Sequence, residues 1–324
     1  MTTKESVLAL LEANRGHSLS GEEMARALCM SRAAVWKAVR ALREDGHGID
    51  AATNRGYALL PGSGVLSAAG ICPYLTDARW ADRVLVFPSV ESTNKTAKEL
   101  ASGGAAHGTV IIADAQTAGR GRYGRTFYSP PGSGLYMSVL FRGAALRLPQ
   151  PTLCTVAAAV AICRAVRSVT GQEAQIKWVN DILLGGRKVC GILTEASTSL
   201  ESGCIDWLVI GIGINVHTDN FPNDLSRTAA SLRPGECGGL RNRLAAALVN
   251  TFLSSDDWLH GAGVFAEYRA HLSMLGRTVT VLEAGGAYDA LALDVDESGR
   301  LVVQKEDGER LTLSSGEISV KIPD

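Results

Sequence analysis

The chain has 324 residues, a formal net charge of −1 at pH 7, and 46% hydrophobic against 20% charged residues. This length predicts about two to three domains, and the apolar fraction is ample for packed cores. The near-neutral charge excludes a whole-molecule affinity for nucleic acid or membrane, so any DNA contact must come from a local patch.

Targeting signals and cysteine usage both point to the cytoplasm. No run approaches the ~18 consecutive apolar residues of a membrane-spanning helix, and residues 1–16 lack the features of a signal peptide. The cysteines are odd in number, widely scattered and without a CxxC pair, which argues against a disulfide framework and a structural zinc site. Most lie in apolar settings, which favours reduced, buried thiols. They are Cys29, Cys72, Cys154, Cys163, Cys190, Cys204 and Cys237.

Residues 1–62 have the pattern of a winged helix-turn-helix domain. Ser20 and Glu23 form a capping box signature, and Ser31 caps the next helix after a short turn. This tight spacing positions a second helix in a DNA major groove. Turn-forming residues between two short strands predict a wing. The expected elements are helices over 6–14, 21–28 and 32–44 and strands over 49–52 and 57–60.

The exposed face of the third helix predicts a DNA contact surface. Its basic side chains would contact phosphates, and one or two of them would contact base edges. Two alternatives stay open: these charges simply solvate a helix face, or Trp36 packs against the helix end without touching DNA. The residues expected to bind DNA are Ser31, Arg32, Trp36, Lys37, Arg40 and, in the wing, Arg55.

A Pro-Gly-Ser-Gly linker at 61–64 separates this module from a second domain over 65–270. Strands that follow one another in sequence, with helices inserted between them, predict an α+β fold with a mixed, mainly antiparallel sheet. Gly185-Gly186 is a plausible two-residue hairpin turn. The expected strands are 83–87, 109–113, 134–141, 174–178, 182–184, 188–196 and 204–210. The expected helices are 94–101, 152–169 and 239–260.

Residues 272–324 predict a small β domain. Five short strands with close turns fit an SH3-like barrel. The expected strands are 278–282, 290–295, 301–305, 310–314 and 318–320.

The stretch 116–125, Gln-Thr-Ala-Gly-Arg-Gly-Arg-Tyr-Gly-Arg, carries the strongest chemical signal. Glycine lets the backbone adopt positive φ and approach a ligand closely. Arginine presents forked donors that match phosphate and carboxylate oxygens. This composition favours a loop that encloses a large anion, although a flexible basic surface loop or a nucleic-acid patch has the same composition.

Further blocks accompany this loop in a fixed order. They are Glu91-Ser92-Thr93-Asn94, Lys177-Trp178-Val179-Asn180-Asp181, residues 186–195, residues 211–216 and residues 228–232. The ordered set resembles the biotin protein ligases. With the N-terminal module, it is similar to the bifunctional members that also repress the biotin operon. Two departures are Val179 in place of a common proline and Tyr123 where repressor-type ligases often carry arginine.

The resemblance implies an enzyme that activates biotin with ATP to biotinyl-5'-AMP. It then transfers biotin to a lysine of the biotin carboxyl carrier protein of acetyl-CoA carboxylase. Mg²⁺ is expected with ATP. Operator DNA and an adenylate-dependent homodimer are the further implied partners, with no membrane partner.

The resemblance also implies roles for individual residues. Lys188 would contact the reacting carboxylate and phosphate, Arg122 would hold the adenylate phosphate, and Asp181 would orient or deprotonate the incoming amine. Alternatively, Lys188 is a surface lysine at a strand edge and Asp181 caps a turn. Biotin-binding residues would be Ser92, Thr93, Asn94, Gln116, Gly119, Lys188 and Gly191. Residues for ATP and the adenylate would be Arg120, Arg122, Arg125, Lys177, Asn180, Asn215 and Ala230. No protein ligand for a metal is assigned.

Two alternatives to this function stay open. One is a ligase whose N-terminal module no longer regulates transcription. The other is a biotin-sensing repressor without catalysis, or a related lipoate ligase.

Overall fold

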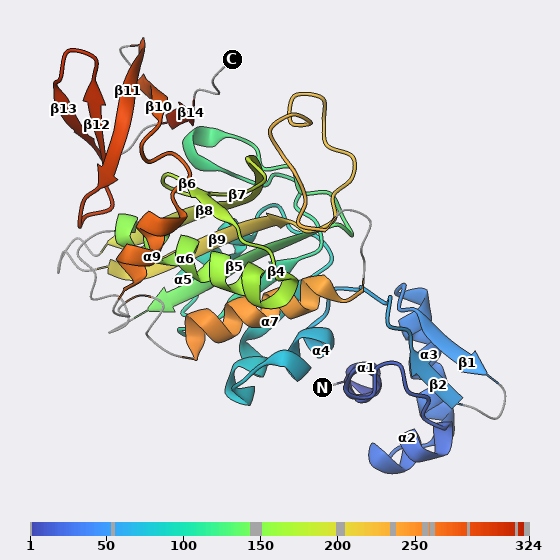
Figure 1. The fold of residues 1–324 in the computed structure, drawn as a ribbon. Coiled ribbons are helices and arrows are strands. Elements are labelled where there is room, and N and C mark those ends of the chain that lie inside the picture. The colour runs from blue at the N-terminus through green and yellow to red at the C-terminus, as the bar shows by residue number, and fades with distance from the viewer. Residues whose placement is uncertain are drawn as a thin grey trace.

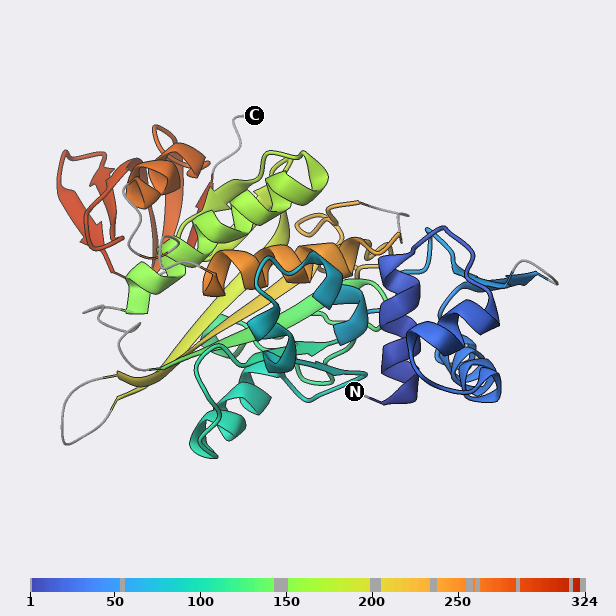
Figure 2. The ribbon, with the colours of Figure 1, turned by 90° about the horizontal axis from the view of Figure 1, so that it is seen from below.

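The computed structural model describes residues 2–52, 56–142, 151–198, 205–233, 238–254, 259, 263–283, 286–314 and 317–320. A helical N-terminal module and a small C-terminal sheet lie at opposite ends of a central seven-stranded sheet (Figure 1; Figure 2). The α+β class expected from the sequence is confirmed.

The N-terminal module has the three helices and the wing hairpin that were predicted. Its first helix begins earlier than expected, because Thr2 and Glu5 form a capping box that the sequence analysis missed. The capping box of Ser20 and Glu23 begins the second helix as predicted, and Ser31 caps the third. The elements are α1 (Thr3–Ala13), α2 (Gly21–Ala27), α3 (Arg32–Glu44), β1 (Ile49–Ala52) and β2 (Gly56–Leu59).

This module has a hydrophobic core of its own, which includes Leu11, Val35 and Leu42. Ala69, from the short helix α4 (Ala68–Ile71), also packs against this core. The module therefore has its own core, and its helix α1 packs against α4 and the following 3₁₀ turn of the central domain.

The linker after β2 is held from both sides. Arg15, just after α1, donates to the carbonyls of Leu60 (3.1 Å) and Ser63 (2.8 Å), and Glu12 forms an ion pair with the same guanidinium. From the central domain, Arg241 donates to the Gly64 carbonyl (3.0 Å) and forms an ion pair with Asp114, which precedes the Gly/Arg loop. Arg241 therefore ties the linker to the strand end from which that loop begins.

The central sheet has the strand order β3-β4-β5-β9-β8-β7-β6. β3 pairs with β4 in parallel and all other neighbours are antiparallel, as the mainly antiparallel prediction requires. Gly185 and Gly186 both have positive φ (57° and 76°) and join β7 to β8, which confirms the predicted turn. The strands are β3 (Val84–Phe87), β4 (Val110–Ala113), β5 (Gly134–Arg142), β6 (Gln175–Lys177), β7 (Asp181–Leu184), β8 (Arg187–Thr198) and β9 (Ile205–Asn215).

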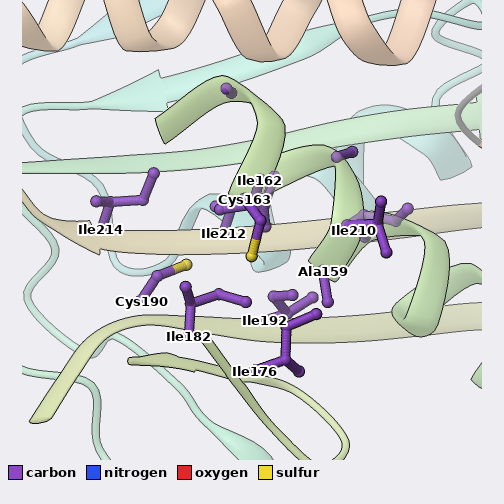
Figure 3. Close-up of a cluster of buried hydrophobic side chains, with 14 of the residues drawn as sticks. Ala159, Ile162, Cys163, Ile176, Ile182, Cys190, Ile192, Ile210, Ile212 and Ile214 are labelled. Atoms are coloured by element: carbon purple, nitrogen blue, oxygen red, sulfur yellow. The ribbon is translucent and has the colours of Figure 1, made fainter. Parts of the chain in front are cut away.

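Helices α6 (Pro151–Thr170), α7 (Leu240–Leu253) and α9 (Val264–His271) cover one face of this sheet (Figure 2). Side chains of a strand alternate between faces, so every second residue of β9 points into this core. Ala159, Ile162 and Cys163 of α6 meet isoleucines of four strands (Figure 3). Within the described ranges, α6 is the one helix long and apolar enough to cross a membrane, but 67% of that stretch is buried, so it packs here as a core helix.

Helix α5 (Thr93–Ser102) packs on the opposite face, where its Ala97 and Ala101 meet Ile111, Leu140 and Val209. This second face carries the ligand cavity described below. Short 3₁₀ helices, η1 (Cys72–Tyr74), η2 (Ala78–Arg83) and η3 (Arg122–Gly124), complete the described central part.

The C-terminal strands form a five-stranded antiparallel sheet in the order β13-β12-β11-β10-β14. Its apolar residues join the core of the central domain, and the Trp178 indole donates to the Gly299 carbonyl at 2.9 Å. The five strands were predicted, whereas their closure into an SH3-like barrel stays a prediction. They are β10 (Thr278–Glu283), β11 (Gly286–Val295), β12 (Leu301–Lys305), β13 (Arg310–Leu313) and β14 (Glu317–Val320).

The predictions for the helix after residue 239 and for the cysteines have mixed outcomes. The predicted helix 239–260 ends at Leu253, and α9 was not expected. Cys154 and Cys163 are buried, which raises the pKa of each thiol to about 12, as expected for reduced core cysteines. Cys190 is buried as well, whereas Cys29 is exposed, so most of the described cysteines are buried, as expected. Cys204 and Cys237 lie outside the described residues.

Candidate active site

A cavity of about 680 Å³ lies on the face of the sheet that carries α5. All the sequence blocks contribute to its lining, although they are spread over more than a hundred residues of chain. The predicted residues that line it are Ser92, Thr93, Asn94, Gln116, Arg120, Arg122, Arg125, Lys177, Asn180, Asp181, Lys188, Gly191 and Asn215.

The floor of the cavity is a strip of glycines on two neighbouring strands. Gly191 of β8 pairs with Gly213 of β9, and Gly211 lies two residues away on the same face. A β-carbon at Gly213 would lie 2.6 Å from the Phe127 ring, and one at Gly211 would overlap the Asn94 side chain. The glycines thus keep the sheet surface open where other side chains and a ligand must lie against the backbone.

One end of the cavity is a buried hydrogen-bonded cluster. Gln116 Oε1 accepts from the Thr93 backbone N–H at 2.8 Å, and Gln116 Nε2 donates to Ser129 Oγ at 2.9 Å. The Ser138 hydroxyl lies 2.8 Å from Thr93 Oγ1 and 2.7 Å from Asn94 Oδ1. These contacts fix the orientation of both amides, so this end presents donors and acceptors in set positions.

The Gly/Arg loop folds over the cavity as a tight turn. Gly121 N–H donates to the Arg125 carbonyl at 2.7 Å, and Tyr123 adopts a left-handed conformation with φ of 56°. Arg122 donates to Asn180 Oδ1 at 3.2 Å and stacks over the Tyr123 ring at 5.0 Å. Arg120 forms an ion pair with Glu91 at 3.5 Å. The loop therefore brings several cations to one side of the cavity, with Arg122 held by two neighbours.

Lys188 and Asp181 form an ion pair of 2.6 Å inside the cavity. Lys188 also pairs through its backbone with residues 228–230: its N–H donates to the Thr228 carbonyl, and its carbonyl accepts from the Ala230 N–H, both at 2.8 Å. Lys188 is therefore neither a free surface lysine nor a strand-edge one, because a second segment covers its backbone.

Two predicted residues do not line this cavity. Gly119 lies in a neighbouring cavity of about 330 Å³ that also contacts Gln116. A β-carbon at Gly119 would lie 2.6 Å from the Phe127 carbonyl, so the glycine serves the packing of the loop itself. Ala230 contributes its backbone to the pairing with Lys188, while Ala229 lines the cavity in its place.

Several lining residues were not predicted. Phe127 follows the Gly/Arg loop directly, and its ring lies against the glycine strip; an aromatic residue so close to a ligand loop was an available signal. The lining residues that lie far from these motifs in sequence carried no sequence signal, because only the fold brings them to the cavity. The further lining residues with polar or aromatic side chains include Tyr128, Phe221, Arg227, Ser273 and Arg277.

The predicted DNA-contact residues Arg32, Trp36, Lys37 and Arg40 are exposed on one side of α3. Trp36 is 55% exposed and the Arg40 guanidinium lies over its ring at 5.9 Å, so it does not pack into the core. Ser31 is exposed as well, and its hydroxyl caps the helix at the Ala34 N–H (3.2 Å). Arg55 lies outside the described residues.

A helix-turn-helix module joined to a mixed sheet with a polar, cation-lined cavity is the architecture of a two-domain class of protein. In this class, one domain binds DNA and the other binds a small ligand. Known families match the same three parts. Residues 3–58 match a helix-turn-helix (HTH) domain, 86–215 the biotin/lipoate A/B protein ligase family, and 274–321 the biotin protein ligase C-terminal domain.

Relatives match along nearly the whole chain. Identity to the bifunctional ligase/repressor BirA of Bacillus spizizenii is 32% over 315 residues, covering 95% of each chain. Identity to the Escherichia coli protein of the same name is 28% over 333 residues, covering 99% of this chain and 98% of the relative. A solved biotin protein ligase from Aquifex aeolicus in complex with biotin and ATP aligns with a TM-score of 0.62 at 26% identity, over 74% of this chain and 98% of that one. The chain belongs to the biotin protein ligase family.

Proposed function

We propose that this protein activates biotin with ATP to biotinyl-5'-AMP and transfers biotin to a lysine of the biotin carboxyl carrier protein of acetyl-CoA carboxylase. The observation that carries this proposal is that one cavity combines three features: an end with fixed hydrogen-bonding groups, a floor of glycines and a side lined by cations. Such a site suits a ligand with a polar ring at one end and a carboxylate at the other.

The polar ring of biotin would lie at the end formed by Thr93, Asn94 and Gln116. A ureido ring carries N–H donors and a carbonyl acceptor, and a buried polar group left unpaired costs about 1–3 kcal/mol. The oriented amides and hydroxyls of this end supply both kinds of partner. Ser92, also buried, lines the same end.

The carboxylate of biotin would then lie towards Lys188 and Arg122. In the first step, a carboxylate oxygen forms a bond to the α-phosphorus of ATP while the bond from that phosphorus to the pyrophosphate oxygen breaks. Negative charge concentrates on the phosphate oxygens, and cations held in a partly desolvated site stabilise it. Lys188 and Arg122 are the side chains placed to do so, with Arg120, Arg125 and Lys177 along the same cavity. Asn180 holds Arg122, and Asn215 lines the nucleotide end.

In the second step, a neutral lysine amine attacks the carboxyl carbon of the adenylate, AMP leaves, and the amine loses a proton. Asp181 is the carboxylate of the cavity closest to Lys188, and we assign it the orientation of the amine and the acceptance of that proton. Binding of the ligand anion to Lys188 would release Asp181 for this role.

Mg²⁺ would enter with ATP. Among the described residues, no three His, Cys, Asp or Glu side chains gather to hold a metal ion. The phosphates of the nucleotide are therefore the ligands we expect to hold it, and no step here depends on a metal bound by protein side chains.

The N-terminal module makes the protein a DNA-binding repressor as well, with operator DNA bound by a homodimer in the cytoplasm. The Gly/Arg loop, ordered around the adenylate, would complete the dimer surface. We divide the chain into a DNA-binding domain (1–62), a catalytic domain (65–270) and a C-terminal domain (272–324). The separate core of the N-terminal module supports the first boundary.

The first experiment is transfer of labelled biotin to a purified carrier domain with ATP and Mg²⁺, with lipoate in parallel. Biotin transfer is the expected result. Transfer of lipoate in its place would identify a lipoate ligase, and binding of biotin without transfer would identify a non-catalytic sensor.

A separate pair of measurements tests the regulatory role. Operator binding should weaken with rising salt, and removing Lys37 or Arg40 should each reduce the salt slope by about one. Sedimentation should show tighter dimerisation with adenylate. A dimerisation constant unchanged by adenylate, together with no specific DNA binding, would leave a ligase whose module does not regulate.

A further inference from the structure

Asn94, at the polar end of the cavity, has its amide nitrogen fully occupied by protein groups. Nδ2 lies 3.1 Å from the Leu193 carbonyl and 2.8 Å from Glu195 Oε2. An amide nitrogen carries two hydrogens, so these two acceptors use both of them. None is left for a ligand.

The amide oxygen of Asn94 lies on the cavity side. Oδ1 is 2.7 Å from the Ser138 hydroxyl, and it stands where a β-carbon on Gly211 would project. Gly211 is part of the cavity floor, so this oxygen lies over the surface on which a ligand would rest. A carbonyl oxygen has two lone pairs, and one therefore remains for a ligand donor after Ser138 is counted.

The Leu193 carbonyl and the Glu195 carboxylate both distinguish the two orientations of this amide, and Glu195 is the charged acceptor of the two. Its carboxylate accepts from Asn94 through Oε2 and from Lys98 Nζ through Oε1 (2.6 Å). Asn94 and Lys98 are four residues apart on α5, so they lie on one face of the helix and grip both oxygens of the same carboxylate. Rotating the amide by 180° would place its oxygen against this carboxylate and replace a charge-assisted hydrogen bond by repulsion.

We propose that Glu195, held by Lys98, is a positioning residue that fixes Asn94 with its oxygen towards the ligand, and so selects ligands with an N–H donor in the ring. This inference rests on the proposed biotin site. Neither Glu195 nor Lys98 lines the cavity, so their effect on the ligand acts through Asn94. A ureido ring satisfies the requirement, whereas the dithiolane ring of lipoate has no donor to offer.

The orientation of the amide can be measured without any ligand. In the ¹H–¹⁵N spectrum of the full chain, the Asn94 side-chain NH₂ pair, identified by its loss in Asn94→Asp, should be protected from solvent exchange. Glu195→Leu should speed the exchange of this pair, because only the Leu193 carbonyl is left to accept from it, and Glu195→Gln, which keeps an acceptor oxygen, should retain most of the protection. An unprotected pair in the unaltered protein would overturn the proposal whatever the protein binds.

Calorimetry then tests the consequence for binding. Glu195→Leu should weaken biotin roughly 3–10-fold, the effect of one net hydrogen bond, while leaving the Kd for ATP unchanged. Glu195→Gln should remain near the unaltered affinity. Glu309→Leu, which removes another ion-paired glutamate in the turn between β12 and β13, is the matched control and should change neither Kd.

The outcomes separate the two claims. Equal weakening of biotin and ATP with a lowered Tm would mean that Glu195 merely ties α5 to the sheet, and would overturn the positioning role. Unchanged biotin affinity in Glu195→Leu would overturn it as well. Absence of biotin binding by the unaltered protein would instead refute the proposed function, with the exchange experiment still deciding the orientation of Asn94.

Discussion

Lys188 and Asp181 lie on the adjacent strands β8 and β7, and their side chains meet at 2.6 Å inside the cavity. Both side chains keep some contact with solvent, with exposed fractions of 35% and 22%. An ion pair at such a position contributes about 1 kcal/mol or less. A ligand anion can therefore compete with Asp181 for Lys188 at little cost.

Replacing Lys188 by alanine should lower the rate of adenylate formation about 10²–10³-fold, the effect expected for one preorganised donor to a developing anion. ATP–pyrophosphate exchange in the presence of biotin measures this step. Lys305→Ala removes a lysine of the C-terminal sheet as a control and should leave the rate unchanged. Near-normal exchange in Lys188→Ala would contradict the role given to Lys188.

Replacing Asp181 by asparagine should slow transfer to the carrier more than it slows adenylate formation. General bases contribute about 10²–10⁴-fold, and this role is used only in the transfer step. Single-turnover transfer from preformed adenylate separates the two steps. Equal losses in both steps would show that Asp181 acts only by holding Lys188.

Tyr123 is 66% exposed, yet it supports Arg122 through ring stacking and through a 3.1 Å contact with its hydroxyl. An exposed cation–π contact contributes about 0.5–1 kcal/mol, so Tyr123→Ala should speed adenylate release roughly 2–5-fold. The rate of adenylate release from Tyr123→Phe should lie between those of the unaltered protein and Tyr123→Ala. Stopped-flow kinetics measure this release, and Tyr74→Ala, at another exposed tyrosine outside the cavity, is the control. An unchanged release rate in Tyr123→Ala would contradict a role for Tyr123 in the site.

A methyl group at Gly213 would lie 2.6 Å from the Phe127 ring. We expect Gly213→Ala to displace this ring, to destabilise the fold by about 1–3 kcal/mol through overpacking, and to weaken biotin binding. Gly62→Ala is the matched control, because a β-carbon there meets no atom within 4 Å. Urea unfolding and biotin titration of both variants measure these effects, and identical results for the two would contradict this account of the floor.

His47 is buried in the N-terminal module, and burial lowers the pKa of its imidazole below 6.5, with Arg15 and Lys4 acting in the same direction and Asp45 opposing. The unfolded chain therefore binds this proton more readily than the folded one. Its contribution to stability is present above about pH 6.5 and is lost as the pH falls towards the folded pKa. Unfolding of the full chain at several pH values should show less acid destabilisation in His47→Gln than in the unaltered protein, and equal acid sensitivity would contradict the assignment.

The sequence predicted the fold wherever local signals were strong. Capping residues and periodicity gave α3 at its observed bounds, and two glycines gave the β7–β8 turn. Strand β9 was predicted over 204–210. It continues to Asn215, since its glycines face a cavity where side chains would not fit, while its isoleucines fill the core on the other face.

For the site, the sequence supplied residues by type and order but not their mutual contacts. Arg43, in the last turn of α3, donates to the Ile49 carbonyl at 3.0 Å through Nε and so supports the hairpin. Likewise, Gly119 and Ala230 serve packing and backbone pairing beside the cavity. Arg277 reaches the lining only because the C-terminal sheet shares a core with the central domain. Long-range packing decides such placements, and no local pattern encodes it.

The two-sided hold on the linker has a geometric consequence for transcription. Arg15 and Arg241 grip its carbonyls from the two domains, so the recognition helix α3 keeps a set direction relative to the catalytic body. In the proposed homodimer, the distance between the two α3 helices would follow from how the two catalytic domains pair. The spacing between the two half-sites of the operator would then report the separation of the two α3 helices, which the pairing of the catalytic domains sets.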